Sequence, residues 1–542
     1  MKKFLALFLA LVLVLGLVAC GRGEKTKKEW DGTLTIGIQP NAFILDRYEN
    51  ALTKWVESEC GVKLKFVEYA GGADVGTQIS TTIAGGQELP DILFGINLEA
   101  TVREKYGSEG YFIDLKDYFA DKEGASKVFW DRINNELSEL DRESLLAELA
   151  NPETGAIYAV PTMETSEFDT MQYQTWINTE WLDKVGKEKP TNKEELVDVL
   201  RAFKNTDCNG NGIADEIPLY GSVAAGIGGH IFDWIMNFFV YYNQQAQYLV
   251  DDNGKLTRVQ TTDEYREGLK FLNQLYEEGL INDTFFTAGQ GEMKQVTTPA
   301  SGVSYCGIFV GHLTVHCTQQ SPLLEKYEPL QTWGYAIRRA SSVGWSNMIS
   351  ADCANPDKAF EVMMKLFTQE GSYRQRYGEK GTNWTDPDEG ATSVIGIPAT
   401  LKVIKDPVAT QNTVQWGNIS CTLNVNAEGE SAQLAGEMDD WTKMKMQMHA
   451  ESSKLFTEAA EKNPEVTCPV LIRTIQERQE LLSERQNIDS ILVAARAGFI
   501  RGEDGYNIDS DADWNAFLKE LNDKGLAKAI VQDQKIYDRQ TK

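Results

Sequence analysis

The segment Gly32-Thr33-Leu34-Thr35-Ile36-Gly37-Ile38 alternates aliphatic residues with small or polar ones, which is the pattern of a half-buried β-strand. Residues 41–59 follow it with helical spacing, and residues 62–67 alternate again as a second strand. Because a strand, a helix and a strand joined by short connections form a right-handed crossover, we expect the two strands to be parallel. The start of the chain therefore predicts an α/β protein with an open sheet, whose ligands lie at the carboxyl ends of the strands.

Further segments continue this α/β pattern. Residues 74–85 have the spacing of a helix, and Leu89-Pro90-Asp91-Ile92-Leu93-Phe94 contains a short buried strand. Residues 110–118 and 155–161 then complete a first lobe. Since a chain of 542 residues is too long for one hydrophobic core, we expect two or three lobes.

The chain is strongly acidic, with a formal net charge of −27 at neutral pH. Such a surface repels nucleic acid and anionic lipid headgroups, so we expect neither of them as a partner. The charge places no restriction on a neutral ligand.

The beginning of the chain has the features of an export signal. A pair of lysines precedes an apolar run, residues 4–18, that is short for a membrane span. The run ends in Leu17-Val18-Ala19-Cys20-Gly21, which resembles the lipobox of a bacterial lipoprotein signal. The resemblance implies that residues 1–19 are a signal peptide, that Cys20 carries the lipid (palmitate included), and that residues 20–29 form a lipidated tether. An uncleaved anchor helix is the alternative, and either arrangement places the rest of the chain outside the cell.

The segment Asp207-Cys208-Asn209-Gly210-Asn211-Gly212-Ile213-Ala214-Asp215-Glu216 has the spacing of a calcium loop. Pro218 occupies the position where an EF-hand has its bidentate glutamate, so the loop is a shortened variant in which the last carboxylates come early. Its hard oxygen donors favour a structural Ca²⁺ over zinc or copper. The candidate ligands are Asp207, Asn209, Asn211, the carbonyl of Ile213, Asp215 and Glu216. A polar surface turn without metal is the alternative.

The order of several segments resembles one family of bacterial proteins. The matching segments are Leu89-Pro90-Asp91-Ile92, Ile157-Tyr158-Ala159-Val160-Pro161, Trp176 to Gly186 with Pro190-Thr191, the calcium loop, residues 262–285, 355–371, 377–384 and 513–539. Together they extend over nearly the whole chain that follows the signal. The chain thus resembles the extracellular solute-binding lipoproteins of ABC importers (family 1), which include carbohydrate-binding and alginate-oligosaccharide-binding proteins.

This resemblance implies a two-lobed, periplasmic-binding-protein-like fold of type II, with the ligand held in a cleft between α/β lobes. By the family's plan, lobe 1 contains residues 30–162 and 335–400, and lobe 2 contains residues 163–334 and 401–542. In calcium-bearing members the loop stiffens the second lobe away from the cleft, so its six candidate ligands are carried over. We expect a monomeric receptor that a lipid anchors to the extracellular face of the cell membrane. We expect it to bind a carbohydrate, specifically an oligosaccharide, and to deliver it to ABC transporter permease subunits.

A sugar receptor needs aromatic rings for the apolar faces of the sugar and polar groups for its hydroxyls. We expect both kinds of residue where the fold exposes the ends of strands. The candidate ring contacts are Tyr173, Trp176, His230, Trp234, Trp345 and Trp416, and the candidate hydroxyl contacts are Asn41, Glu164 and Asp169. Ordinary core packing is the alternative for each aromatic residue.

Catalytic motifs are missing from the sequence. It has no GxSxG, no Walker loop and no GxGxxG after a strand, so we expect no enzyme. His312 and His316 lie one helical turn apart beside Cys317, which would suit zinc, but the glutamate of HExxH and a clear third ligand are missing. A peptide or other small organic solute remains the alternative ligand. A secreted carbohydrate-active enzyme, which needs only two suitably spaced carboxylates, is the alternative class.

The cysteines do not form an obvious disulfide pattern. Of the eight in the chain, seven remain once Cys20 is lipidated, and none of these forms a CxxC pair. An odd number without close pairs predicts mostly free thiols.

Overall fold

A computed structural model describes most of the chain. The described residues are 29–70, 74–171, 173–224, 230–242, 247–318, 320–330, 333–337, 341–393, 395–405, 407, 410–425, 429–433, 440–462, 468–469, 471 and 473–541. The predicted signal peptide, Cys20 and all of the tether except Glu29 lie outside these residues.

The chain folds into two compact units, each assembled from separate stretches of sequence. Unit 1 comprises the described residues up to Glu164, together with Ser342–Thr385 and Val403–Val425. Unit 2 comprises Thr165–Ser341, Asp386–Lys402 and Asn426–Lys542. We expected residues 403–425 in lobe 2, but they lie in unit 1, because Leu423 and Asn424 pair with the strand that ends at Glu164. The described residues of 335–341 and 386–400, which we expected in lobe 1, lie in unit 2.

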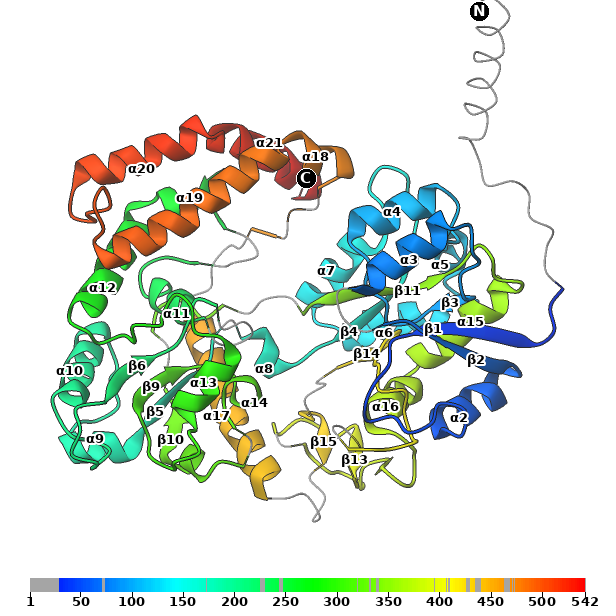
Figure 1. Ribbon diagram of the computed structural model, residues 1–542, viewed down its shortest axis with the longest axis horizontal. Helices are drawn as coiled ribbons and strands as arrows, with labels where there is room; N and C mark the ends of the chain where they lie inside the picture. The colour runs from blue at the N-terminus through cyan, green and yellow to red at the C-terminus, as the bar shows by residue number, and fades with distance from the viewer. Residues whose placement is uncertain are drawn as a thin grey trace, which may run out of the picture. The chain divides into compact units, whose positions relative to one another are not determined.

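Unit 1 is built on one mixed sheet (Figure 1). Its strands lie in the order β14 (Leu423–Asn424), β4 (Val160–Glu164), β11 (Val343–Ile349), β3 (Ile92–Leu93), β1 (Thr33–Ile38) and β2 (Lys63–Glu68). Strands β1 and β2 run parallel from Thr33 opposite Lys63 to Ile38 opposite Glu68, and β1 is also parallel to β3. Strand β11 is antiparallel to both β3 and β4. The predicted parallel pair of strands is therefore confirmed.

Helices cover both faces of this sheet, with α3 and α4 on one side and α2 and α16 on the other (Figure 1). The helices of unit 1 are α2 (Ala51–Cys60), α3 (Asp74–Ala84), α4 (Ala100–Ser108), α5 (Lys116–Ala120), α6 (Lys127–Glu136), α7 (Glu139–Leu149), α15 (Pro356–Phe367) and α16 (Gln369–Tyr377). The short strand β12 (Trp384–Thr385) follows α16.

The first helix begins later than the sequence pattern predicts. We expected helical structure from residue 41, but α2 starts at Ala51, with Asn50 accepting a hydrogen bond from the Leu52 amide. The Asp46 carboxylate accepts hydrogen bonds from the Tyr48 and Glu49 amides, and such short-range side-chain bonds compete with a helix. Residues 41–50 therefore form a loop.

Unit 2 contains a second sheet, in the order β10 (Tyr327–Pro329), β5 (Thr175–Asn178), β9 (Cys306–Val310) and β6 (Ile217–Tyr220). Strand β9 is antiparallel to β5 and parallel to β6. The helices of this part are α8 (Glu167–Thr170), α9 (Thr179–Val185), α10 (Lys193–Lys204), α11 (Ile231–Met236), α12 (Asp263–Glu277), α13 (Gln290–Thr297), α14 (Leu313–His316) and α17 (Asp440–Lys462). Strand β13 (Leu401–Val403) pairs in parallel with β15 (Ala432–Gln433), and a 3₁₀ turn spans Pro322–Lys326.

A C-terminal helical layer completes unit 2 (Figure 1). It consists of α18 (Ile475–Glu480), α19 (Leu482–Arg501), α20 (Asp511–Asp523) and α21 (Leu526–Thr541). Helix α19 packs on α12, and α21 packs on the hairpin formed by β7 (Tyr248–Val250) and β8 (Leu256–Arg258). A 3₁₀ turn, Val259–Thr261, joins this hairpin to α12.

Each unit has its own hydrophobic core. Buried residues such as Ile36, Leu93 and Met348 form the core of unit 1, whereas Ile308, Leu272 and Phe499 belong to the core of unit 2. Two separate sheets and cores confirm the predicted α/β class and two-lobed architecture. Within the described part of the chain, no helix combines the length and the apolar character that a membrane span requires.

Candidate functional site

The predicted calcium loop connects the end of α10 to the start of β6. Its first carboxylate, Asp207, accepts hydrogen bonds from the amides of Gly210 at 2.7 Å and Gly212 at 3.1 Å. Both glycines have a left-handed backbone, with φ of 76° and 77°, which other residues adopt only with strain. The Asp207 side chain therefore folds the backbone of the loop around itself.

The remaining predicted side chains of the loop meet at Asp215. Its carboxylate accepts hydrogen bonds from the side-chain amides of Asn209 at 2.7 Å and Asn211 at 3.0 Å. Glu216 accepts from the Asn209 backbone amide at 3.3 Å, and the Ile213 carbonyl accepts from the Asp215 amide at 3.0 Å. The structure thus links five of the six predicted ligands by hydrogen bonds, and the sixth, Asp207, binds the glycine amides of the same loop.

The donor set of this loop fits a hard cation, but its two asparagine amides are not turned for coordination. The NH₂ groups of Asn209 and Asn211 point at Asp215, where a cation would need their oxygens. Rotation of each amide by half a turn would bring its oxygen to this position, but it would break the hydrogen bonds that the Asn209 and Asn211 oxygens accept from the Asn211 and Ile213 amides. Among the described residues, no group of three or more histidine, cysteine, aspartate or glutamate side chains is arranged to hold a metal ion.

The predicted hydroxyl contacts bind their own neighbours within unit 1. Asn41 donates to the Gly417 carbonyl at 2.8 Å and accepts from the Phe43 amide at 2.9 Å, so it fixes the loop that follows β1. Glu164, at the exposed end of β4, accepts from Asn424 at 3.1 Å. The side chain of Asp169 lies outside the described residues.

The predicted ring contacts are mostly core residues. The exposed fraction is 6% or less for every one of Tyr173, Trp176, Trp234, Trp345 and Trp416. Trp345 and Trp416 belong to the core of unit 1, and the other three lie in unit 2. The sixth candidate, His230, is half-buried immediately before α11. For most of these residues, core packing explains the position, and their contact with a ligand stays a prediction.

Trp234 differs from the other candidate tryptophans in the hydrogen bonding of its indole N–H group. Trp176 donates to the Gly311 carbonyl at 2.7 Å, Trp345 to Glu148 at 2.9 Å and Trp416 to Thr53 at 2.8 Å. In the described residues, the buried indole nitrogen of Trp234 has no such partner, and the same is true of Trp333, whose ring lies 6.2 Å away. Buried donors without a partner are rare, so this pair has hydrogen-bonding capacity available for a ligand.

The histidine pair considered for zinc is occupied by local hydrogen bonds. His316 Nδ1 accepts from the His312 amide at 2.8 Å, and His312 Nδ1 lies 2.8 Å from the Thr314 hydroxyl. Burial raises the pKa of the neighbouring Cys317 thiol to about 12, which keeps it protonated. These contacts form a capped helical turn.

His449, on α17, is a residue whose role the sequence did not reveal. It is completely buried, with its ring centroid 4.2 Å from that of Phe168 and 4.9 Å from that of His312. Neither ring nitrogen has a hydrogen-bond partner among the described residues. Burial, followed by the charges of His312 and Lys445, holds the pKa of His449 well below 6.5. The imidazole is therefore neutral.

Two curated proteins are similar to this chain in sequence. No protein-family model matches the chain. The chain is 30% identical to the fructooligosaccharide ABC transporter substrate-binding protein FusA of Streptococcus pneumoniae serotype 4 over 247 residues. This stretch covers 44% of this chain and 43% of FusA. Over 287 residues the chain is 27% identical to lipoprotein LipO of Bacillus subtilis, 52% of this chain and 51% of that one. The matched stretches span about half the length of these curated relatives.

Solved structures match over nearly the whole chain. An extracellular solute-binding protein from Bifidobacterium longum subsp. infantis aligns with a TM-score of 0.73 and 21% identity, over 94% of this chain and 98% of its own. FusA in complex with kestose aligns with a TM-score of 0.68 and 21% identity, over 94% and 99% of the two chains. These matches confirm the two-lobed fold and the predicted resemblance to solute-binding proteins of ABC importers.

Two further structures concern the calcium loop. An EF-hand mutant of FusA in complex with fructo-nystose aligns with a TM-score of 0.67 and 20% identity, over 94% of this chain and 99% of that one. The alginate-binding protein AlgQ2 without calcium ion aligns with a TM-score of 0.57 and 18% identity, over 93% and 98% of the chains. An EF-hand is thus named for one protein with this fold, and a calcium ion for another.

Proposed function

We propose that this chain is the substrate-binding protein of an ABC importer and that it captures an oligosaccharide outside the cell. The observation that carries the proposal is a fold with two α/β units that aligns over 94% of the chain with FusA in complex with kestose. The match in sequence to a fructooligosaccharide receptor supports the same ligand class.

The function requires the two units to change their relative arrangement when a sugar binds. The chain passes from one unit to the other several times, first after Glu164 and last after Val425, so closure must be a hinge motion of several segments. A sugar that binds the closed form more tightly than the open form shifts the population towards closure. The closed receptor then delivers the sugar to the permease, and the protein itself performs no chemistry.

The proposal includes a lipid anchor on Cys20. The sequence Leu17-Val18-Ala19-Cys20 supports it, and one relative in sequence is named a lipoprotein. A lipidated Cys20 would hold the receptor on the extracellular face of the cell membrane, as a monomer beside the permease. Mass spectrometry of the protein purified from membranes tests this point, because substitution of Cys20 by alanine should release an unmodified protein.

We further propose that the loop of residues 207–216 holds a structural Ca²⁺. The ligands would be Asp207, Asn209, Asn211, the Ile213 carbonyl, Asp215 and Glu216. A bound cation supplies charge neutralisation for the carboxylates of the loop. The chain's own contribution is the Asp207 turn, which already fixes the backbone between α10 and β6.

Thermal unfolding of the protein lacking residues 1–20 tests both parts of the proposal. A ligand that binds only the native state raises Tm by mass action. At a ligand concentration one hundred times Kd, the free energy of unfolding increases by about 2.7 kcal/mol. We expect Ca²⁺ to raise Tm by several degrees relative to EDTA, and one class of oligosaccharide to raise it further. The sugar panel contains kestose, fructo-nystose, neutral milk oligosaccharides and alginate oligosaccharides.

A control variant separates the ion from the sugar. Asp207→Asn with Asp215→Asn removes two carboxylates from the loop, so the Ca²⁺-dependent rise should disappear while the shift caused by sugar remains. A Tm shift with peptides and none with any sugar would contradict the carbohydrate proposal. Equal Tm in Ca²⁺ and EDTA for the unsubstituted protein would show that the loop is a metal-free turn.

A further inference from the structure

Unit 2 contains a cavity of about 250 Å³ beside α19. Its lining includes Tyr242, Gln260, Tyr265, Asp489, Val493 and Arg496. The first three come from the segment after α11, the 3₁₀ turn after β8 and the start of α12. Asp489, Val493 and Arg496 are spaced four and three residues apart on α19, so they lie on one face of that helix.

The inner part of the cavity consists of buried aromatic rings. Tyr242 and Tyr265 are 6% and 3% exposed, and their ring centroids lie 6.0 Å apart. The Phe232 ring packs edge-on against both of them. Burial raises the pKa of Tyr242 to about 12, so its hydroxyl is neutral, and it lies within hydrogen-bonding reach of the Gln260 side chain.

Polar atoms at this cavity have unused hydrogen-bonding capacity. Gln260 is 2% exposed, and its amide nitrogen donates to Gln247 at 2.8 Å, which fixes the side chain. The Gln260 carbonyl oxygen has no partner in the described part of the chain, and neither has Nε of Arg496. Arg496 is held with its guanidinium 5.0 Å from the centroid of the Phe232 ring. A buried acceptor without a partner is costly unless a ligand or water satisfies it.

The mixture of donors and acceptors indicates the class of ligand. The Gln260 oxygen and the exposed Asp489 carboxylate would repel an anion, because both are hydrogen-bond acceptors. A neutral polyhydroxylated ring donates and accepts through each hydroxyl, and its apolar face suits the tyrosine rings. Because the volume lies below the roughly 300–1,000 Å³ of pockets for larger ligands, the cavity has room for one ring and not for a chain.

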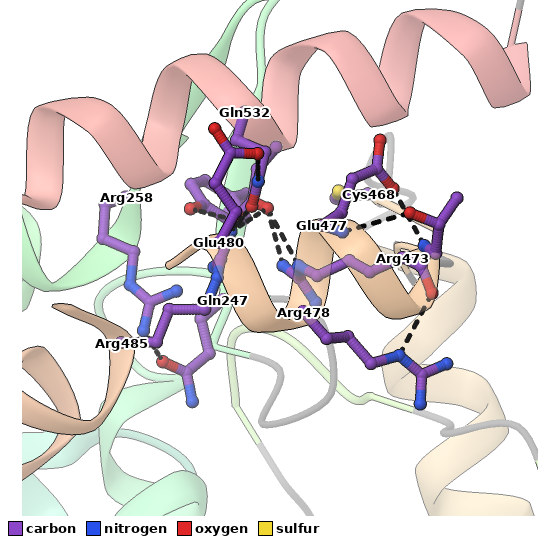
Figure 2. A network of polar contacts seen from close by, with 12 residues as sticks. Gln247, Arg258, Cys468, Arg473, Glu477, Arg478, Glu480, Arg485 and Gln532 are labelled. Atoms are coloured by element: carbon purple, nitrogen blue, oxygen red, sulfur yellow. Dashed lines mark hydrogen bonds and ion pairs between the residues drawn. The ribbon is translucent and has the colours of Figure 1, made fainter. Parts of the chain in front are cut away.

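The residues behind the cavity hold this arrangement in place. The Gln247 side-chain oxygen accepts from Arg258 as well as from Gln260. Arg258 lies over the ring of Tyr248, and the Tyr248 hydroxyl donates to buried Asp533 at 2.7 Å. Figure 2 shows Gln247 and Arg258 together with Arg473 and Arg485, which both pair with Asp533. Such support behind a site keeps its geometry fixed before the ligand arrives.

We propose that this cavity is a subsite for a single neutral sugar ring, with Gln260 accepting from one hydroxyl and Arg496 donating to another. The proposal rests on the proposed function and adds the place and the charge class of the sugar that is bound.

Substitutions of two equally exposed valines test it. Val493 lines the cavity and is 59% exposed, and Val531, on α21, is 57% exposed and is not part of the lining. We expect Val493→Trp to fill the mouth of the cavity and to weaken binding of the best oligosaccharide of the panel at least tenfold by calorimetry. Val531→Trp is the matched control and should bind with the affinity of the unsubstituted protein. The best sugar should be neutral, with alginate oligosaccharides weaker.

Gln260→Leu provides a second variant that keeps the size of the side chain. The loss of one hydrogen bond to a hydroxyl should weaken binding about tenfold, with the Tm measured without sugar staying close to that of the unsubstituted protein. If the unsubstituted protein binds a sugar and both variants bind it equally well, the subsite is overturned and the proposed function stands. If the unsubstituted protein binds no sugar of the panel, the proposed function fails, and the subsite with it.

Discussion

Two polar regions next to the β7–β8 hairpin use their hydrogen-bonding groups in opposite ways. The Asp533 carboxylate, fully buried, accepts hydrogen bonds from Tyr248, Arg473 and Arg485. The cavity nearby contains Gln260 and Arg496, each with a buried atom that has no partner among the described residues. The carboxylate of the first region is satisfied, although Nε of Arg485 beside it has no partner among the described residues, whereas the cavity leaves the Gln260 oxygen and Nε of Arg496 unsatisfied.

Buried polar groups can serve either the stability of the fold or the binding of a ligand. A satisfied buried charge ties together the segments that carry its partners, here the residues just before α18, helices α19 and α21, and the hairpin. A buried group without a partner lowers the stability of the fold, but its hydrogen-bonding capacity remains available to a ligand. The two regions should therefore respond differently to the same kind of substitution.

The largest expected effect is at Asp533. Burial alone would raise the pKa of this carboxyl, but hydrogen bonds from Arg485 and Tyr248 and the charge of Arg473 hold it below its usual value. Asp533→Ala leaves two partly buried arginines without their partner, so we expect unfolding in urea to require about 3–5 kcal/mol less free energy. Asp523→Ala, at an exposed ion pair with Lys519 on α20, is the control and should lose less than about 1 kcal/mol. Similar losses for the two variants would refute the comparison.

The next effect concerns His449, which extends the comparison to a buried ring without partners. Because its pKa is lower in the folded protein than the usual 6.5, the unfolded chain takes up a proton first as pH falls. Stability should thus be full above pH 6.5 and decrease below it, by up to about 1.4 kcal/mol per pH unit from this residue. Urea unfolding between pH 7.5 and about 5 measures this slope.

His449→Leu should make the slope shallower over the same range, since it removes the titrating group and keeps an apolar side chain. His230→Gln is the control, because His230 is only half-buried. An unchanged slope in His449→Leu would show that another group dominates the acid sensitivity.

The smallest expected effect is the change in stability of Gln260→Leu. The variant loses the hydrogen bond to Gln247, worth about 1 kcal/mol, but it also removes a buried oxygen whose desolvation costs about 1–3 kcal/mol. We expect the free energy of unfolding to stay within about 1 kcal/mol of the unsubstituted value, in contrast to Asp533→Ala. A loss as large as that of Asp533→Ala would mean that the Gln260 oxygen is satisfied in the native protein.

Local patterns were predictable from the sequence. The parallel pair of β1 and β2 follows from alternation on both sides of a helix, and the calcium-loop residues meet because they lie within ten positions of one another. The start of α2 was misplaced, because side-chain hydrogen bonds at Asn41 and Asp46 oppose the helical spacing. These bonds are local, so the two Asx residues were the signal that could have corrected the prediction.

The cavity could not have been predicted in the same way. Tyr242, Gln260, Tyr265 and Arg496 are ordinary residues of different elements, and only the packing of α19 on α12 brings them together. Nor does sequence distinguish Trp234 from Trp176, since the difference is whether a backbone carbonyl lies near the indole nitrogen. His449 likewise becomes notable only because its neighbours offer no partner.

The buried cysteines make this protein convenient for labelling. All seven cysteines after Cys20 lie among the described residues, where they are buried and outside any disulfide, and burial raises the pKa to about 11 at Cys60 and Cys208 and to about 12 at Cys306 and Cys468. Thiolates are the species that react with maleimide dyes, so at neutral pH the native cysteines should remain unlabelled in the folded protein. One cysteine introduced at an exposed position of each unit, such as Tyr48 and Val531, could then carry a donor and an acceptor fluorophore. Energy transfer between these dyes would report lobe closure in solution without replacing any native cysteine of the folded units.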